Sequence, residues 1–260
     1  MRLNYHRFGS GPPLLLLHGI GHRWQGWEPV FDRVAPEREL IAVDLPGFGD
    51  SPAPPTGTPA GIDSITDLLV AFLDDLGLER PHVAGNSLGG WAALELAKRG
   101  RAASATALSP AGFQNALEAI YQHTSFRITI RTSRLIADRA EQVLSRPRLR
   151  VLAFGQLVRH PLQIPLGDVG PTVRALAHAP WFDDTLRAIN AGRFTGGEQI
   201  AVPTTIAWGE HDLILLRRQA RRAARAIPAA RMLTLTGCGH VPMTDDPEQV
   251  ARVLLEGSAG

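Results

Sequence analysis

The chain has 260 residues, of which 44% are hydrophobic and 20% are charged, and this composition excludes disorder, collagen and coiled coil as its main state. Its 27 basic and 25 acidic residues give a net charge of +2, so no strong field favours nucleic acid or an anionic membrane as a partner. The length suits one large α/β domain or two smaller ones, and either can bury a sizeable core.

Short apolar runs alternate with longer amphipathic stretches, and this pattern is typical of βα units around a parallel sheet. Most runs are too apolar for strands that expose one face to water, so we expect helices on both faces. The predicted strands cover residues 3–8, 14–18, 40–44, 82–85, 105–109, 204–208 and 232–236. The predicted helices cover residues 62–76, 88–99, 215–227 and 247–255.

A long segment between the fifth and sixth predicted strands carries no convincing strand. Residues 115–157 are helix-like and rich in Arg, and prolines divide the remainder into short pieces. Because such a connection is too long for an ordinary loop, we predict an inserted helical subdomain at 112–200 and a core formed by 1–111 and 201–260. Residues 113–200 contain 11 Arg and 7 acidic residues, so positive charge concentrates in this insertion.

The sequence shows no feature of a secreted or membrane-spanning chain. The single cysteine, Cys238, excludes an internal disulfide and a thiolate zinc cluster, and we interpret it as a buried packing residue. The longest apolar run, residues 68–73, is far shorter than the roughly 20 residues of a membrane helix. Residues 1–18 do not resemble a signal peptide, so we expect a cytoplasmic protein.

The most specific motif is GNSLGG at residues 85–90, between a predicted strand and a predicted helix. A serine in a G-x-S-x-G turn of this kind lies on a sharp bend with its hydroxyl exposed above the sheet, and the glycines let strand and helix approach closely. The alternative is a serine that only caps the helix. We expect Ser87 to be a catalytic nucleophile.

The motif HGIG at residues 18–21 follows the second predicted strand. Acyl transfer needs two backbone N–H groups directed at the developing oxyanion, and we expect these from Leu88, which follows the nucleophile, and from Ile20. The alternative is a tight turn whose glycines only relieve strain. His18 itself is interpreted as a structural hydrogen-bonding residue.

An acid and a base are expected after the nucleophile, in that order. The motif GEHD at 209–212 and the motif GCGH at 237–240 each follow a predicted strand, at the sheet edge where α/β proteins bind ligands. We predict His240 as the general base and Asp212 as the residue that orients it, with Glu210 as the competitor of Asp212. Asp245 and Asp246 are interpreted as helix-start residues.

These motifs, together with DLPGFGDS at 44–51, resemble those of serine hydrolases with the α/β-hydrolase fold and a helical cap. The resemblance covers essentially the whole chain. It implies a mainly parallel sheet, a cap inserted after the strand that follows the nucleophile's helix, and a triad of Ser87, Asp212 and His240 that needs no metal or organic cofactor. It also implies that Asp44 shapes a loop near the site. Since the chain begins close to its first strand, the outermost strand of the family is expected to be absent.

The resemblance implies hydrolysis of a carboxylic ester of a small molecule through an acyl-enzyme. Haloalkane dehalogenases and epoxide hydrolases are similar in outline but have Asp at the nucleophile position, where this chain has Ser87. Plant-type hydroxynitrile lyases have a catalytic lysine in the cap region, whereas the only lysine here, Lys98, lies on the helix after the nucleophile. No feature of the sequence indicates an oligomeric state.

Two alternative activities use the same triad. The first is carbon–carbon bond hydrolysis of a vinylogous diketone acid, as in meta-cleavage-product hydrolases; Asn86 and a basic cap fit that group, but GHR at 21–23 replaces its Gly-Pro-Gly. The second is a lactonase, or a biosynthetic acyl-transfer or cyclising enzyme. A ligand-binding protein with slow turnover is a third possibility.

The residues that contact the substrate are less clearly indicated. Eight arginines between residues 127 and 159 are accompanied only by Asp138 and Glu141, which favours either a solvated helix face or one or two arginines that pair with a substrate carboxylate. Aromatic side chains are candidates for the pocket or, more commonly, for core packing. These aromatic candidates are Trp24, Trp27, Trp91, Phe113 and Trp181.

Overall fold

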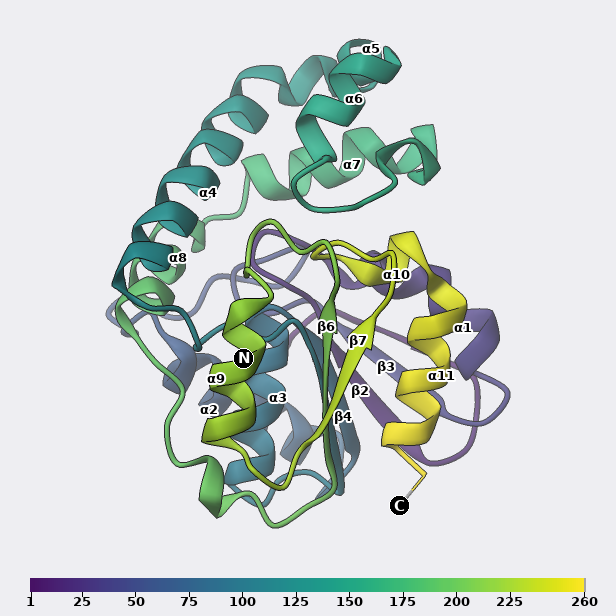
Figure 1. The fold of residues 1–260 in the computed structure, drawn as a ribbon, viewed down its shortest axis with the longest axis vertical. Helices are drawn as coiled ribbons and strands as arrows, with labels where there is room; N and C mark the ends of the chain where they lie inside the picture. The colour runs from purple at the N-terminus through teal and green to yellow at the C-terminus, as the bar shows by residue number, and fades with distance from the viewer. Residues whose placement is uncertain (260) are drawn as a thin grey trace.

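A computed structural model of the chain describes residues 1–259 and contains one seven-stranded sheet in the order β1-β3-β2-β4-β5-β6-β7 (Figure 1). The strands are β1 (Tyr5–Phe8), β2 (Pro13–Leu17), β3 (Glu39–Val43), β4 (His82–Asn86), β5 (Ser104–Leu108), β6 (Thr204–Gly209) and β7 (Arg231–Leu235). β1 pairs antiparallel with β3 at one edge, and every other pairing in the sheet is parallel. The predicted mainly parallel α/β sheet is therefore confirmed, and β1 is its outermost strand in the described residues.

Helices cover both faces of the sheet, as the continuous apolar runs predict. One face carries α1 (Glu28–Val34), α10 (Pro242–Asp245) and α11 (Pro247–Gly257), and the other carries α2 (Ile62–Asp75), α3 (Leu88–Lys98) and α9 (Arg218–Ala226) (Figure 1). Successive strand residues point to opposite faces. In β2, Leu15 and Leu17 accordingly belong to one hydrophobic cluster, while Leu14 and Leu16 belong to the other.

The chain between β5 and β6 is helical, and we call residues 112–200 the cap segment. It contains α4 (Ala116–Ile136), α5 (Ala140–Leu144), α6 (Pro147–Phe154), α7 (Leu166–Ala177) and α8 (Phe182–Ala191), and α5, α6 and α7 lie above the carboxyl ends of the strands (Figure 1). The two ends of the segment meet, because Phe194 N–H donates a 2.9 Å hydrogen bond to Gly112 O. The Phe113 and Phe194 rings pack with centroids 5.4 Å apart beside it.

Short 3₁₀ helices complete the described residues. They are η1 (Trp24–Trp27), η2 (Ala137–Arg139), η3 (Pro161–Gln163) and η4 (Gly197–Gln199). Within residues 1–259, none of the helices combines the length and the apolar character needed to cross a membrane. The longest of them, α4, has 21 residues and carries Glu118 and several arginines.

Three helical predictions differ from the structure in instructive ways. The helix-like stretch 115–157 is divided among α4, α5 and α6, since a new helix starts at Pro147, whose missing N–H is tolerated at the first helical position. The helix expected from residue 215 begins only at Arg218. Conversely, α7 continues through Pro171. Pro171 has no N–H to donate to the Gly167 carbonyl, but Gly167 is exposed, so water can hydrogen-bond to that carbonyl instead.

Candidate active site

Ser87 lies at the turn between β4 and α3 in a strained backbone conformation, with φ 57° and ψ −114°. The neighbouring glycines are required by close backbone approach: a Cβ on Gly85 would lie 2.1 Å from Gly89 O, and a Cβ on Gly89 would lie 2.1 Å from Leu17 O. The Ser87 side chain makes no capping hydrogen bond to α3. The alternative that this serine is only a helix cap is therefore contradicted.

His240 and Asp212 are buried partners at the carboxyl ends of neighbouring strands. His240 Nδ1 donates to Asp212 Oδ2 at 2.8 Å, which leaves the other ring nitrogen, Nε2, free of this bond. Asp212 Oδ1 accepts hydrogen bonds from the N–H groups of Ile214 and Leu215 at 2.9 and 2.8 Å. These two bonds hold the turn after β6, and this explains why α9 begins later than the periodicity predicts.

Glu210, the predicted competitor of Asp212, points to a different loop. Its Oε2 accepts a 3.0 Å hydrogen bond from Gly237 N–H and lies 3.8 Å from His211 Nε2. The acid that contacts His240 is therefore Asp212. Asp245 and Asp246 were both interpreted as helix-start residues, and this is correct for Asp246, which caps α11. Asp245 instead accepts hydrogen bonds from the backbone N–H groups of residues 159, 160 and 239.

Ser87 and His240 line the same cavity, which has a volume of about 650 Å³. The loop at Gly19, Ile20 and Gly21 forms part of its wall. Leu88 occupies the first position of α3, where a backbone N–H has no intrahelical partner. The structure thus brings together the predicted nucleophile, the base and both loops from which oxyanion donors are expected.

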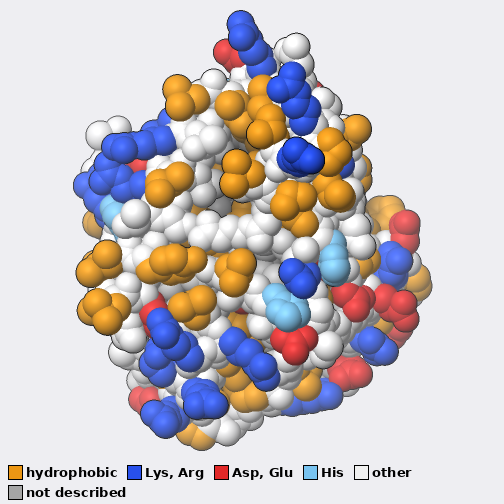
Figure 2. All heavy atoms as spheres, turned by 45° about the horizontal axis from the view of Figure 1, so that its top comes forward, with side chains coloured by type: hydrophobic (Ala, Val, Ile, Leu, Met, Phe, Trp, Pro, Cys, Tyr) orange, Lys and Arg blue, Asp and Glu red, His pale blue; other side chains and the backbone are white. Residues whose placement is uncertain are grey.

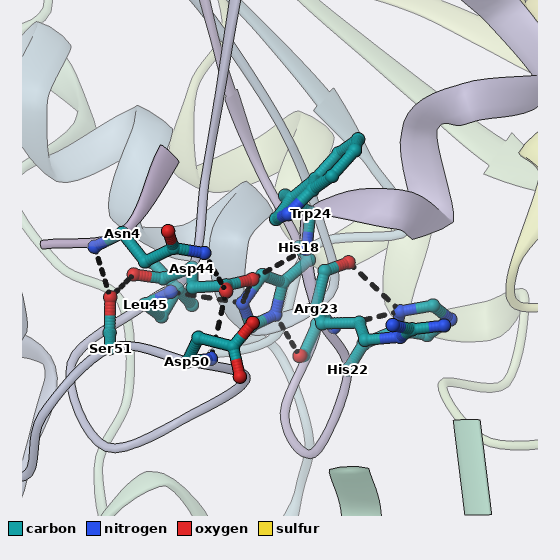
Figure 3. Close-up of polar contacts among 10 residues, drawn as sticks. Asn4, His18, His22, Arg23, Trp24, Asp44, Leu45, Asp50 and Ser51 are labelled. Carbon is teal, nitrogen blue, oxygen red and sulfur yellow. Dashed lines mark hydrogen bonds and ion pairs between the residues drawn. The ribbon is translucent and has the colours of Figure 1, made fainter. Parts of the chain in front are cut away.

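The carboxylate of Asp44 organises the loops behind this wall (Figure 3). It is buried and accepts hydrogen bonds from Trp24 N–H, Asn4 Nδ2 and Asp50 N–H at 2.6 to 2.9 Å. A Cβ on Gly49, whose φ is +54°, would lie 2.3 Å from this carboxyl group. Asp44 therefore has the structural position that the family resemblance implies.

His18 is also structural, as predicted. Its Nδ1 donates to Gly19 O at 2.7 Å, and its Nε2 accepts from Leu45 N–H at 2.9 Å, which together define a neutral imidazole (Figure 3). Burial lowers the pKa of His18 to about 4 despite the nearby Asp44 carboxylate. Burial similarly raises the pKa of the Cys238 thiol to about 12, which agrees with a packing role for that residue.

Two residues at the site were missed by the sequence analysis. Asn86 Nδ2 donates to His240 O at 2.9 Å and to Leu108 O at 3.1 Å, so it ties the base-bearing loop to the strand that carries Ser87. His22 lines the cavity, and its Nδ1 accepts a 2.9 Å hydrogen bond from Arg23 N–H (Figure 3). A polar residue at the end of an apolar strand was the available signal for Asn86, and proximity to the HGIG motif was the signal for His22.

The cap segment supplies most of the remaining cavity wall. One face of α4 contributes a row of hydroxyl groups at helical spacing, and apolar side chains of α5, α6 and α7 complete the wall. The hydroxyl-bearing residues are Tyr121, Thr124, Ser125, Thr129, Thr132 and Ser133. Within residues 1–259, the side chains that line this cavity include no Asp, Glu, Lys or Arg.

The wall of this cavity gives no support to the hypothesis that a cap arginine binds a substrate carboxylate. None of the eight arginines between residues 127 and 159 is among the described cavity-lining residues. Arg134 pairs with Asp183 at 3.0 Å on the outside of the cap segment. Arginine stems are long enough to reach solvent from such a face, which is the other interpretation that the sequence left open.

The aromatic candidates are packing residues. Trp27, Trp91, Phe113 and Trp181 are buried in the hydrophobic clusters, and Trp24 stacks on His6 with ring centroids 4.5 Å apart. No member of this group is among the cavity-lining residues in the described chain.

The chain belongs to the alpha/beta hydrolase family, whose family model matches residues 14–253. It is 32% identical over 198 residues to epoxide hydrolase EphH of Mycobacterium tuberculosis, covering 73% of this chain and 91% of that protein. It is 29% identical over 249 residues to the dihydrolipoyllysine-residue acetyltransferase component of the acetoin cleaving system of Pseudomonas putida; the match covers 95% of this chain and only 63% of that relative. A thermophilic esterase from Thermogutta terrifontis has a similar structure, with a TM-score of 0.72 and 23% identity over 98% of this chain and 92% of that one.

Proposed function

We propose that this protein is a serine hydrolase that cleaves carboxylic esters of small molecules through an acyl-enzyme. The observation that carries the proposal is the strained Ser87 at the start of α3, in a cavity that it shares with a histidine whose Nδ1 is bonded to a buried carboxylate. A buried Asp that fixes the tautomer of a His near a Ser in the same cavity is the arrangement that activates serine for attack.

In the proposed mechanism His240 acts first as a base and then as an acid in each half-reaction. Ser87 Oγ attacks the ester carbonyl while His240 Nε2 takes its proton, and Asp212 stabilises the imidazolium. The N–H groups of Ile20 and Leu88 donate to the oxyanion, and His240 then gives the proton to the departing alcohol. A water molecule, deprotonated by His240, attacks the acyl carbonyl carbon, and His240 then returns the proton to Ser87 Oγ as the C–Oγ bond breaks and the acid is released. In this proposal the cap segment, residues 112–200, encloses the substrate above the core formed by 1–111 and 201–260.

Epoxide hydrolysis, the activity named for one relative, does not suit a serine nucleophile. Opening an epoxide with a serine hydroxyl would leave a stable ether, whereas a carboxylate nucleophile leaves an ester that water can hydrolyse. Carbon–carbon bond hydrolysis of a vinylogous diketone acid would place a carboxylate in a cavity whose described lining contains no cation. Ester hydrolysis therefore remains the function that we propose.

The replacement Ser87→Ala tests the proposal. We expect the variant to lose about 10⁴- to 10⁶-fold of its turnover of p-nitrophenyl esters, because triad members act as one unit. It should also lose covalent labelling by a fluorophosphonate probe, which reports on the nucleophile independently of any substrate. Cys238→Ser is the matched control and should retain labelling, since Cys238 is not among the cavity-lining residues described. Labelling that persists in folded Ser87→Ala protein would show that another residue is the nucleophile.

A further inference from the structure

The cavity that contains Ser87 has a wall without formal charge. Its described lining combines apolar side chains with hydroxyls, two side-chain amides and two histidines. Burial lowers the pKa of His22, so this imidazole is neutral at pH 7. Since an ionised carboxylate loses its hydration in such a site and gains no cation in return, its entry is strongly unfavourable.

The hydroxyl row on α4 does not replace a cation. Ser125 Oγ donates to Gln156 Oε1 at 2.7 Å, and Thr129 Oγ1 donates to the Ser125 carbonyl at 3.1 Å, so these two hydroxyl protons are already used inside the protein. Gln156 Nε2 in turn donates to Tyr121 Oη at 3.0 Å. The oxygen atoms of this network are suited to neutral polar groups of a ligand, and they repel an anionic one.

The cavity is long, and it is open at its outer end. Its lining residues on α4 extend from Tyr121 to Ile136, which at about 1.5 Å per residue corresponds to about 22 Å along the helix axis. Ser87 is buried, whereas Tyr121, Ile128 and Leu152 line the same cavity with exposed fractions of 42%, 62% and 80%. Figure 2 shows this top face of the molecule, with a hollow surrounded by hydrophobic side chains and with arginines farther out.

We propose that this cavity selects uncharged esters with a long apolar chain and rejects esters of the same length that end in a carboxylate. The inference rests on the proposed function in that Ser87 is taken as the reacting end. The chain then extends from Ser87 along α4 toward the opening beside Leu152. No cap arginine is among the described residues that line this path; Arg146 and Arg148 line a neighbouring hollow that shares only Leu149 with the cavity.

The test compares kcat/KM at pH 7 for p-nitrophenyl acetate, p-nitrophenyl octanoate and the mono-p-nitrophenyl ester of octanedioic acid. Full burial of a methylene increases kcat/KM about fourfold, so we expect octanoate to exceed acetate by about 100-fold or more. We expect octanoate to exceed the octanedioate half-ester by about tenfold or more, because the terminal carboxylate is partly desolvated at the end of the cavity without a partner. Equal values for the octanoate and the half-ester, or a preference for the half-ester, would overturn the inference.

A charge placed at the opening provides a matched pair of variants. Leu152 lines the cavity, whereas Leu135 is 86% exposed and is not among the described lining residues. Leu152→Arg should reduce the octanoate-to-half-ester ratio about three- to fivefold, as expected for a solvent-exposed ion pair. Leu135→Arg adds the same charge elsewhere on the cap segment and should leave the ratio unchanged. An equal response of the two variants would show that the carboxylate end does not lie at this opening, contrary to the inference.

Ligand binding separates this inference from the proposed function. Isothermal titration of folded Ser87→Ala protein with 1-octanol and with 8-hydroxyoctanoate, which carries its carboxylate at the end of the chain away from the hydroxyl, requires no turnover, and we expect octanol to bind at least about tenfold more tightly. Equal affinities would overturn the inference even in an active esterase. If octanol is preferred but wild-type protein is not labelled by fluorophosphonate, the selectivity stands and the serine hydrolase mechanism fails.

Discussion

One carboxylate, that of Asp212, serves two neighbours at once. Oδ1 holds the N–H groups of Ile214 and Leu215, and Oδ2 accepts from His240. The two hydrogen bonds to Oδ1 fix the orientation of the carboxyl group, and this orientation directs Oδ2 at His240 Nδ1. A substitution that preserves Oδ1 can therefore disturb the histidine while leaving the turn in place.

Asp212→Asn is that substitution. The amide oxygen can continue to accept from the turn, which directs the NH₂ group at His240 Nδ1 and forces the imidazole proton onto Nε2. We expect kcat for ester hydrolysis to fall about 10⁴-fold in a folded protein. Glu210→Gln is the control, and because Glu210 contacts Gly237 instead, its effect should be far smaller. If kcat falls more in Glu210→Gln than in Asp212→Asn, Glu210 rather than Asp212 is the acid that orients His240.

His18 makes the stability of the protein depend on pH. Its pKa is about 4 when folded and 6.5 when unfolded, so between these values the unfolded state binds the additional proton. The contribution is complete above about pH 6.5 and is lost as the pH falls toward 4, with a total of about 3 kcal/mol in the free energy of unfolding.

His18→Gln removes this titration. We expect the variant to be less stable at pH 7 but to lose less stability than wild type when urea denaturation is repeated at pH 4.5. His22 and His82, whose pKa values burial also lowers, are present in both proteins, so the difference isolates His18. Parallel pH profiles for the two proteins would disprove the assignment.

The residues of the proposed triad could be selected from the sequence because each lies in a short motif next to a strand. Ser87, Asp212 and His240 needed only local sequence and the rule that parallel strands end at one edge. The bond from Asn86 to His240 O joins residues 154 positions apart, and no local pattern encodes it. Likewise, His22 lines the cavity because the cap segment lies above it, and the position of that segment is not encoded in the local sequence around His22.

α4 is fastened to the core by a buried carboxylate at its first turn. Glu118 forms a capping box with Asn115 and is also bonded to Arg218 and Arg222 of α9. Arg222 Nε in turn donates to Phe113 O at 2.5 Å. This cluster connects the beginning of the cap segment to a helix of the core, so it sets the position of the cavity wall relative to Ser87.

Glu118→Ala should destabilise the protein by about 2 kcal/mol, because it removes a buried carboxylate and leaves the half-buried Arg222 guanidinium and the Asn115 N–H without this partner. The measurement is the free energy of unfolding in urea. Glu141→Ala breaks an exposed ion pair with Arg174 in the same segment and serves as the control, with a much smaller expected loss. Equal losses in the two variants would show that the cluster at Glu118 does not anchor the segment.

The secondary structure of the core was more predictable than that of the cap segment. The predicted strands agree with β1 to β7 within about two residues at each end, since a strand buried on both faces is a continuous apolar run. Helices α1, α7, α8 and α10 were not predicted. α7 contains Pro171, and its stability depends on packing against α4 and α5, which sequence periodicity does not report. The hydroxyl row on α4 does have helical spacing and was available as a signal.

At the scale of the whole molecule, the cap segment carries a net positive charge, whereas the described side chains that line the cavity include no Asp, Glu, Lys or Arg. The described cavity wall contains none of the 11 arginines of residues 113–200; Arg134, Arg174 and Arg187 form ion pairs, and Arg150 is buried and donates to Ile164 O. Long-range steering acts on charged ligands and is screened by salt. For an uncharged ester, raising NaCl from about 0.02 to 0.5 M should therefore change kcat/KM by less than about twofold. A steep decrease with salt would reveal a charged contact in the transition state.

The hydrogen bond between Phe194 and Gly112 has a consequence for how the protein can evolve. The chain leaves the core and returns to it at nearly one point, so a helical segment of another length can be exchanged there while β5 and β6 stay paired. Such an exchange has to supply apolar side chains in place of Trp181 and Phe182, which pack into the core. Within that limit, recombination at this junction can replace in a single event the part of the cavity wall that the cap segment supplies, while the core residues around Ser87 stay the same.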